Sequence, residues 1–304
     1  MKHIFIFDTE SFYEDEWRMD AIFDSIEQYF RDQGKTDFCI KVSRFRRDAI
    51  VLIEEQINET EEGDTVRVYA VGGDGILFDC LNGIAGLSNI ELAVVPYGNS
   101  ISFLRIFGEG KAELFKDIDS LINAAAIPTD IIYTGNNYVL NAGFIGLIPA
   151  ITVKMKGVNN KLLAFFNYLS IVYDKRIIAQ QYQITIDDRD YSGKYSLIKI
   201  ANGPYYSDDK FAAAGAMPDD GWLDVILFKS SNPLANLLSM RMHSKGKKPS
   251  NCIILRAKKI AVLSNEPMWI QLDSEFLNDT NITFEVIPQA VQFVTADNLT
   301  YQKP

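Results

Sequence analysis

Residues 65–85 have the sequence TVRVYAVGGDGILFDCLNGIA, and this stretch decides the fold of the N-terminal half. Residues 65–71 form a short, mostly apolar run, which predicts a buried parallel strand. Gly72, Gly73 and Gly75 then allow a tight turn, and the helix predicted after them would offer free N–H groups to phosphate. In α/β sheets, ligands bind just beyond the carboxyl ends of the strands, where this turn falls. An ordinary strand–helix turn also explains these glycines.

Strand and helix patterns alternate through the rest of the N-terminal half. Short apolar runs predict further strands, and the segments between them carry apolar side chains at helical spacing. The predicted elements are strands at 3–7, 39–45 and 92–96 and helices at 17–31 and 48–57. This alternation predicts a doubly wound α/β domain, which we place at residues 1–128.

Beyond Pro128 the pattern changes to alternating strands with polar turns. Residues 187–193, DDRDYSG, have the composition of a hairpin turn, and one helix is predicted at about 159–174. The strand candidates are 131–144, 181–203, 221–228, 251–264, 268–276 and 282–294. We therefore expect a mainly antiparallel β-sandwich over residues 129–290, with residues 291–304 packing back on the first domain.

The chain of 304 residues has an ordinary globular composition, 47% hydrophobic and 23% charged, with a formal net charge of −10. This acidic balance argues against nucleic-acid binding, whose affinity depends on a basic surface. Cys39, Cys80 and Cys252 lie far apart, and only His3 and His243 could join them. We therefore expect a reducing compartment and no zinc site.

No segment has the pattern of a signal peptide or a membrane span. The N-terminal apolar run stops at Asp8, and the longest uncharged stretch, 131–153, is too polar for a bilayer core. We expect a cytoplasmic protein that touches membranes only peripherally. Residues 225–265 contain eight basic residues and no acidic one, which is typical of a solvated face but also suits docking to anionic lipid headgroups.

Three further motifs contain groups that could take part in chemistry. Residues 96–105, PYGNSISFLR, form a second glycine-bearing turn after a predicted strand. Residues 216–224, AMPDDGWLD, carry paired carboxylates that suit either a turn into a hairpin or a hard cation. Residues 270–276, IQLDSEF, place Asp273 and Glu275 on one face of an extended strand, where one could act as a general base while the other shifts its pKa.

The order of these motifs is more informative than any one of them. GGDG, P-x-G…F-x-R, N-x-G-F, NGPYY…PDDG-x-LDV and Q-x-D-x-E resemble the diacylglycerol kinase catalytic-domain family of soluble lipid kinases. The resemblance implies an NAD kinase-like α/β domain followed by a β-sandwich, with ATP and Mg²⁺ as cofactors. It implies that Glu275 is the base acting on the lipid hydroxyl, that Asp74 anchors Mg²⁺–ATP and that Asp220 holds a structural Mg²⁺. The implied nucleotide-binding residues are Gly72, Gly73, Asp74, Gly75, Gly98 and Asn99.

Several positions depart from the family's motifs. Ile76 replaces a threonine, Ile101 and Ser102 replace Asn and Asp, and Ser274 replaces a glycine. Residues 8–11, DTES, stand where the family has a phosphate loop, and an acidic loop is electrostatically unfavourable beside a triphosphate.

Three hypotheses for the function follow. The leading one is an ATP-dependent lipid kinase that phosphorylates the hydroxyl of diacylglycerol or a related lipid. The alternative is a pseudokinase that binds nucleotide or lipid without catalysis. An NAD kinase fits less well, because no TPTGSTAY-like segment is present. The expected partner is a lipid substrate at a membrane surface, and a homodimer is compatible with the sequence.

Overall fold

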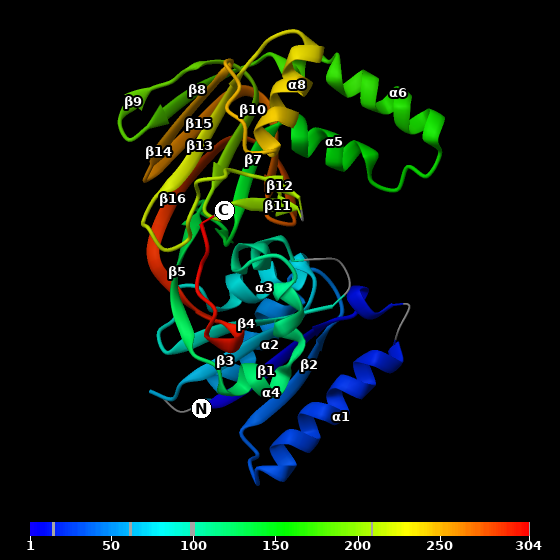
Figure 1. Ribbon diagram of the computed structural model, residues 1–304, viewed down its shortest axis with the longest axis vertical. Helices are drawn as coiled ribbons and strands as arrows, with labels where there is room; N and C mark the ends of the chain where they lie inside the picture. Colours follow the sequence, from blue (N-terminus) through cyan, green and yellow to red (C-terminus); the bar gives the residue numbers. More distant parts are fainter. Residues whose placement is uncertain (14–15, 61–62, 98–100, 208, 304) are drawn as a thin grey trace. The chain divides into compact units, whose positions relative to one another are not determined.

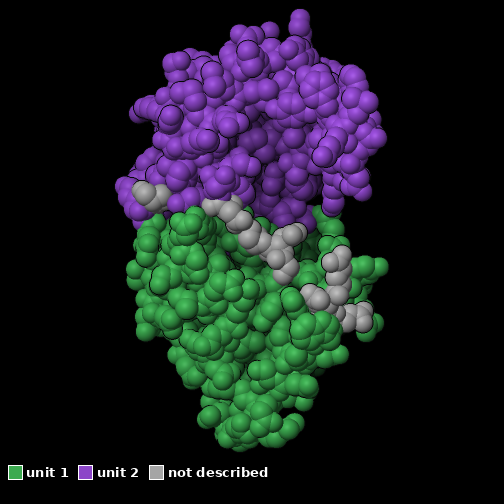
Figure 2. All heavy atoms as spheres, turned by 45° about the vertical axis from the view of Figure 1, so that its right-hand side comes forward, with its two compact units in different colours: residues 1–130, 288–302 green, residues 131–287, 303–304 purple. Residues whose placement is uncertain are grey.

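The computed structural model describes residues 1–13, 16–60, 63–97, 101–207 and 209–303 of the chain. These residues divide into two compact units, which Figure 2 distinguishes. Unit 1 comprises residues 1–130 and 288–302, and unit 2 comprises residues 131–287 and 303–304. Each unit contains a sheet with helices packed on it.

Unit 1 is built around a parallel sheet with the strand order β16-β4-β3-β1-β2. Its strands are β1 (Lys2–Asp8), β2 (Phe38–Ser43), β3 (Val66–Gly72), β4 (Ile90–Pro96) and the end of β16 (Glu275–Val294). The chain runs from β1 to β2 and then returns to β3 on the other side of β1. The strand order therefore reverses between β1 and β3, and such a switch point is where α/β sheets bind ligands.

Helices connect the parallel strands of unit 1 (Figure 1). They are α1 (Glu16–Asp32), α2 (Asp48–Asn58), α3 (Asp74–Ile84) and α4 (Ile118–Asn123), with 3₁₀ turns η1 (Glu10–Phe12), η2 (Ser102–Phe107), η3 (Lys111–Lys116) and η4 (Ala296–Asn298). α1, α2 and α3 each follow a strand of the same number, and β1 and β3 are almost wholly buried. This confirms the doubly wound α/β fold that the sequence predicts.

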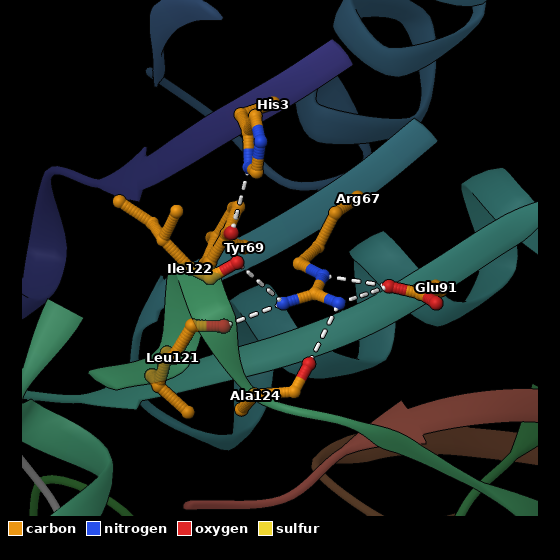
Figure 3. Close-up of polar contacts among 7 residues, drawn as sticks. All are labelled: His3, Arg67, Tyr69, Glu91, Leu121, Ile122 and Ala124. Carbon is orange, nitrogen blue, oxygen red and sulfur yellow. Dashed lines mark hydrogen bonds and ion pairs between the residues drawn. The ribbon is translucent and has the colours of Figure 1, made fainter. Parts of the chain in front are cut away.

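Arg67 on β3 is a buried charge that fixes α4 to the sheet (Figure 3). Its Nε donates to the Glu91 carboxylate on β4 at 2.6 Å. Its remaining N–H groups donate to the carbonyls of Leu121, Ile122 and Ala124 at 2.6, 3.1 and 2.9 Å. Carbonyls at a helix C-terminus have no intrahelical partner, so one guanidinium satisfies them while Glu91 neutralises its charge.

Unit 2 is mainly antiparallel β structure (Figure 1). Its strands pair in the order β14-β13-β10-β7-β15-β16, and β8 pairs with both β10 and β15. The strands of this path are β7 (Ala142–Gly146), β10 (Gly193–Ala201), β13 (Leu223–Lys229), β14 (Cys252–Ala257) and β15 (Lys259–Leu272), with β8 at Gln180–Ile186. Off this path lie β5 (Ala126–Tyr133), which begins in unit 1, and the two-residue strands β6 (Tyr138–Val139) and β9 (Arg189–Asp190). β11 (Tyr205–Ser207) and β12 (Lys210–Phe211) form a separate two-stranded sheet. β8 folds the sheet back on itself, as in the predicted β-sandwich.

The hairpin turn predicted within residues 187–193 is confirmed. Ile186 pairs with Arg189, and Asp187 and Asp188 between them have φ values of 43° and 65°. Left-handed conformation at both central residues is the geometry of type I′ two-residue hairpin turns, and aspartate tolerates it better than most residues.

Unit 2 also contains more helix than the sequence pattern predicts. Its helices are α5 (Leu147–Met155), α6 (Lys161–Val172), α7 (Lys175–Ile178) and α8 (Pro233–Ser244). α6 confirms the helix predicted at about 159–174, whereas α5 and α8 are new. α8 begins with a proline, and the Asn232 side chain caps it by accepting from Ala235 N–H at 2.9 Å, a start pattern that the strand-based interpretation overlooks. No helix in the described ranges is long and apolar enough to cross a membrane.

Candidate functional site

The glycine turn at residues 72–75 joins β3 to the N-terminus of α3. Gly72 has a φ of +150°, and a Cβ there would lie 2.9 Å from Asp8 Cβ and 3.0 Å from Ser11 Oγ, so only glycine fits. Gly75 is exposed, and a Cβ on it would meet no atom within 4 Å. An anion could therefore approach the first N–H groups of α3 from the Gly75 side.

Three strand ends meet at this edge of the unit 1 sheet. β1 and β3 pair in parallel up to their carboxyl ends, and Gly72 of β3 pairs with Pro96 of β4. Tyr97 N–H donates to the Gly72 carbonyl at 3.0 Å. The two glycine-bearing turns that the sequence identifies thus leave neighbouring strands at one edge. Gly98 and Asn99, predicted to bind nucleotide, lie outside the described residues.

Residues 8–11 form a closed turn against Gly72. One oxygen of the Asp8 carboxylate accepts the Ser11 hydroxyl at 2.8 Å, and the other accepts Glu10 N–H at 3.0 Å. The chain continues into η1, where Phe12 is buried. The loop that stands in place of the family's phosphate loop is therefore held by its own carboxylate, which adds a negative charge beside the glycine turn.

The substitutions at Ile76 and Ile101 place apolar side chains where the resemblance implies polar ones. Ile76 is 3% exposed and its Cγ2 would lie 3.0 Å from a Cβ on Gly72, so it packs under the turn. Ile101 is 4% exposed, and Ser102 next to it begins η2 and is also buried. These residues contribute to the core of unit 1, and the side chains of the two isoleucines have no group that could hydrogen-bond a nucleotide.

Glu275 is 8% exposed and begins β16 in unit 2. Leu272 pairs with Glu275, so Asp273 and Ser274 form a two-residue turn between β15 and β16. The prediction of a single strand over residues 268–276, with both carboxylates on one face, is wrong because the chain reverses at Asp273, whose φ is 48°. The left-handed position falls on Asp273, so serine replaces glycine at 274 without backbone strain.

Asp273 anchors the loop that enters β7. Its carboxylate accepts the N–H groups of Leu140, Asn141 and Ala142 at 2.8, 3.1 and 2.9 Å. Burial raises the pKa of Asp273 to about 6, and the three backbone hydrogen bonds oppose this rise. Because these bonds occupy the Asp273 carboxylate, Asp273 is a poor candidate for a base.

The motif at residues 202–206 packs on the same loop. Asn202 Nδ2 donates to the Leu140 carbonyl at 2.7 Å, and its N–H donates to the Asn141 carbonyl at 2.8 Å. Asn141 Nδ2 in turn donates to the Tyr205 carbonyl at 2.7 Å. The sequence gives Asn141 within a motif but assigns it no role. Its hydrogen bonds link three of the motifs in unit 2.

The loop that contains Asp220 does not suit the structural Mg²⁺ that the resemblance implies. Arg256 forms an ion pair with Asp220, and its Nε lies 3.7 Å from Oδ2 of Asp224, its neighbour across β13 and β14. The other Asp220 oxygen accepts Trp222 N–H at 3.1 Å. The guanidinium competes with a hard cation for these carboxylates. Within the described residues, no group of three or more His, Cys, Asp or Glu could hold a metal ion.

The basic residues of segment 225–265 are partly neutralised within unit 2. Arg256 pairs with two aspartates, and Lys259 Nζ donates to Glu285 at 2.7 Å. Lys258 Nζ lies 5.2 Å from the centroid of the Trp222 ring. These contacts favour a solvated face for this part of the segment over a dedicated lipid-docking surface.

Comparison with protein families assigns two domains to the chain. Residues 15–134 match the diacylglycerol kinase catalytic domain, and residues 159–295 match the YegS C-terminal NAD kinase beta sandwich-like domain. The chain is also similar to proteins named "Putative lipid kinase" from Staphylococcus aureus strains Mu3 and Newman. Each is 25% identical over 266 residues, which cover 86% of this chain and 87% of the relative.

Solved structures with a similar fold include a diacylglycerol kinase from Bacillus anthracis strain Sterne. It has a TM-score of 0.66 and 21% identity, with 98% of both chains covered. An NAD kinase from Archaeoglobus fulgidus in complex with ATP has a TM-score of 0.50 and 11% identity, and the match covers 98% of this chain and 94% of that one. At these identities the structures support the fold alone, and they agree with an NAD kinase-like first domain followed by a β-sandwich.

Proposed function

Since residues 15–134 match the diacylglycerol kinase catalytic domain and residues 159–295 match the YegS C-terminal NAD kinase beta sandwich-like domain, we propose that the chain is an ATP-dependent lipid kinase of this family. The acceptor in this proposal is the hydroxyl of diacylglycerol or a related lipid. The phosphoryl donor is ATP.

The observation that carries the proposal is the glycine turn at the switch point of the unit 1 sheet. Gly72 is restricted to glycine by its φ and by Asp8, whereas Gly75 borders open space at the start of α3. A helix N-terminus that opens to solvent at the carboxyl end of a parallel strand favours binding of phosphate. The triphosphate of ATP is the ligand that a kinase would place there.

In the proposed reaction Glu275 takes the proton from the lipid hydroxyl. The oxygen then forms a bond to the γ-phosphorus while the bond from that phosphorus to the β,γ-bridging oxygen breaks, and ADP leaves. Asp74, the first residue of α3, would anchor Mg²⁺ as it enters with ATP, and the ion would neutralise charge on the phosphates. Asp273 holds the turn that precedes Glu275.

The departures at residues 8–11, Ile76 and Ile101 remove polar contacts and add negative charge beside the glycine turn. We therefore expect weak affinity for Mg–ATP. If the affinity for Mg–ATP were too low for turnover, or if phosphoryl transfer itself did not occur, the protein would be a pseudokinase, which is the alternative that the sequence leaves open.

The test is phosphoryl transfer from labelled ATP to diacylglycerol in mixed micelles. Glu275→Gln should lower turnover by about 10²–10⁴-fold, because the amide cannot accept the proton. Glu266→Gln, an exposed glutamate in the same unit, is the matched control and should retain activity. A wild-type rate no higher than that of Glu275→Gln would refute the proposal, and calorimetric binding of Mg–ATP without turnover would establish the pseudokinase.

A further inference from the structure

α6 exposes an apolar face to solvent. It packs against unit 2 through Ile171 and Val172, which are buried. Four large apolar side chains in the first half of the helix are nevertheless exposed: Leu162, Leu163, Phe165 and Phe166 are 66, 52, 56 and 58% exposed. A helix that is apolar on its exposed side as well as its buried side needs a second apolar environment.

α5 and α6 form a helical hairpin on one side of the unit 2 sheet (Figure 1). Together with the first residues of α7, this hairpin (residues 147–176) carries five basic residues and one acid. All five basic side chains are exposed: Lys154, Lys156, Lys161, Lys175 and Arg176. The acidic residue, Asp174, accepts a hydrogen bond from the Arg176 guanidinium at 2.9 Å. The hairpin is thus positively charged in a chain whose net charge is −10.

We propose that this hairpin docks the protein on anionic membranes, with the exposed face of α6 inserted at the boundary between headgroups and acyl chains. At 12 residues α6 is about 18 Å long, too short to cross the hydrocarbon core but suited to lying in the interface. The flanking lysines face the anionic headgroups. The inference deepens the proposed function. That docking brings the protein to a lipid substrate rests on the proposal that the protein is a lipid kinase.

Charge decides between a membrane and a second copy of the chain as the occupant of this face. In a twofold dimer the same surface meets itself, so two sets of basic side chains would be brought together. Like charges across an interface oppose association, whereas an anionic lipid surface attracts every one of them.

Co-sedimentation with vesicles tests the docking face. Wild type should bind vesicles of phosphatidylglycerol and phosphatidylcholine. Leu162→Asp/Phe166→Asp should lower the partition coefficient by about 100-fold, since two exposed apolar side chains lose their burial in lipid. The matched control is Val51→Asp/Leu87→Asp, two exposed apolar residues of unit 1, which should bind as wild type does. Circular dichroism and thermal melting check that each variant is folded.

A second variant tests the charges. Lys154→Gln/Lys156→Gln/Lys161→Gln should weaken binding to anionic vesicles by about tenfold or more and reduce its salt dependence, while binding to pure phosphatidylcholine stays unchanged.

Equal vesicle binding by wild type and by the aspartate variant would overturn the inference. So would a wild-type dimer that the aspartate variant converts to monomer while vesicle binding is unaltered. Turnover measured with lipid in detergent micelles separates the two proposals. If there is no turnover but vesicle binding depends on α6, only the kinase proposal is refuted. If there is turnover but vesicle binding is unchanged by the α6 substitutions, only the docking face is refuted.

Discussion

Asp273 and Ala142 are joined by two hydrogen bonds that run in opposite directions. Ala142 N–H donates to the Asp273 carboxylate at 2.9 Å, and Asp273 N–H donates to the Ala142 carbonyl at 2.9 Å. The same carboxylate accepts N–H groups from Leu140 and Asn141. The turn between β15 and β16 is therefore fixed to the start of β7, and the position of Glu275, two residues on, depends on this attachment.

Replacing Asp273 by Asn should loosen that attachment. The amide has one acceptor oxygen in place of two, and its NH₂ group would face backbone donors, so we expect a loss of about 1–3 kcal/mol in the free energy of unfolding. Turnover should fall while the KM for ATP, bound by unit 1 in the proposal, stays the same. Urea denaturation and steady-state kinetics measure both effects. Asp279→Asn, an exposed site on β16, is the control, and equal stability of the two variants would contradict the role of Asp273.

Alanine at Gly72 and at Gly75 should have opposite effects. Gly72→Ala brings a Cβ to within 3.0 Å of Asp8, Ser11 and Ile76 at a φ of +150°, so its melting temperature should drop by several degrees. Gly75→Ala meets no atom and lies in a helix, so its stability should equal or exceed that of wild type. Its methyl group would nevertheless enter the proposed phosphate site and weaken Mg–ATP binding in calorimetry. An affinity of Gly75→Ala for Mg–ATP equal to that of wild type would show that phosphate does not bind at this turn.

The features that the sequence predicts correctly are those that local chemistry determines. β3 is an apolar run followed by glycines, one of which no other residue can replace, and α3 starts directly after them. The turn at Asp187 and Asp188 is likewise specified by residues that accept positive φ. In each case the residue types at the turn itself specify its backbone conformation, although distant residues such as Asp8 also contact it.

The features that the sequence misses depend on distant residues. Residues 268–276 show one alternating pattern although the chain reverses within them. The reversal is not visible in the sequence, because the residue with positive φ is Asp273, which is held by a loop 131 to 133 positions away. Arg256 meets Asp220 only because β13 and β14 pair in one register. The basic run at 225–265 suggests a docking surface in sequence, but ion pairs across strands neutralise part of it, while the exposed face of α6 becomes apparent only when its burial is known.

Arg256 should make the stability of unit 2 independent of divalent cations. A chelator should leave the melting temperature of wild type unchanged. Arg256→Met removes the guanidinium that pairs with the nearly buried Asp224 carboxylate. It should therefore lower the free energy of unfolding by about 1–3 kcal/mol. Millimolar Mg²⁺ or Ca²⁺ should then restore part of the loss, because the two carboxylates become available. Lys258→Met is the control. A fall in the melting temperature of wild type on chelation would show that a metal is bound at this loop after all.

Lys199 on β10 is a charge-bearing side chain in the core of unit 2, 1% exposed. Its Nζ donates to the Phe211 carbonyl at 3.0 Å and lies 5.0 Å from the centroid of the Tyr206 ring and 3.5 Å from His243 Nδ1. Burial lowers the pKa of Lys199 to about 7. Burial, together with the charge of Lys199, also lowers the pKa of His243 to about 4.

Stability should therefore rise with pH through the range in which Lys199 loses its proton only in the folded state. Above pH 7 the unfolded chain keeps the proton that the folded chain releases, so the free energy of unfolding increases by up to about 1.4 kcal/mol per pH unit until the unfolded lysine titrates near 10.5. Below pH 7 both states are protonated and the term is constant. Lys199→Met removes it, so the stability of wild type relative to this variant should climb between pH 7 and 9 in urea denaturation. Lys194→Met, an exposed lysine of the same strand, should give a flat difference, and a flat difference for Lys199→Met as well would mean that the buried lysine keeps an ordinary pKa.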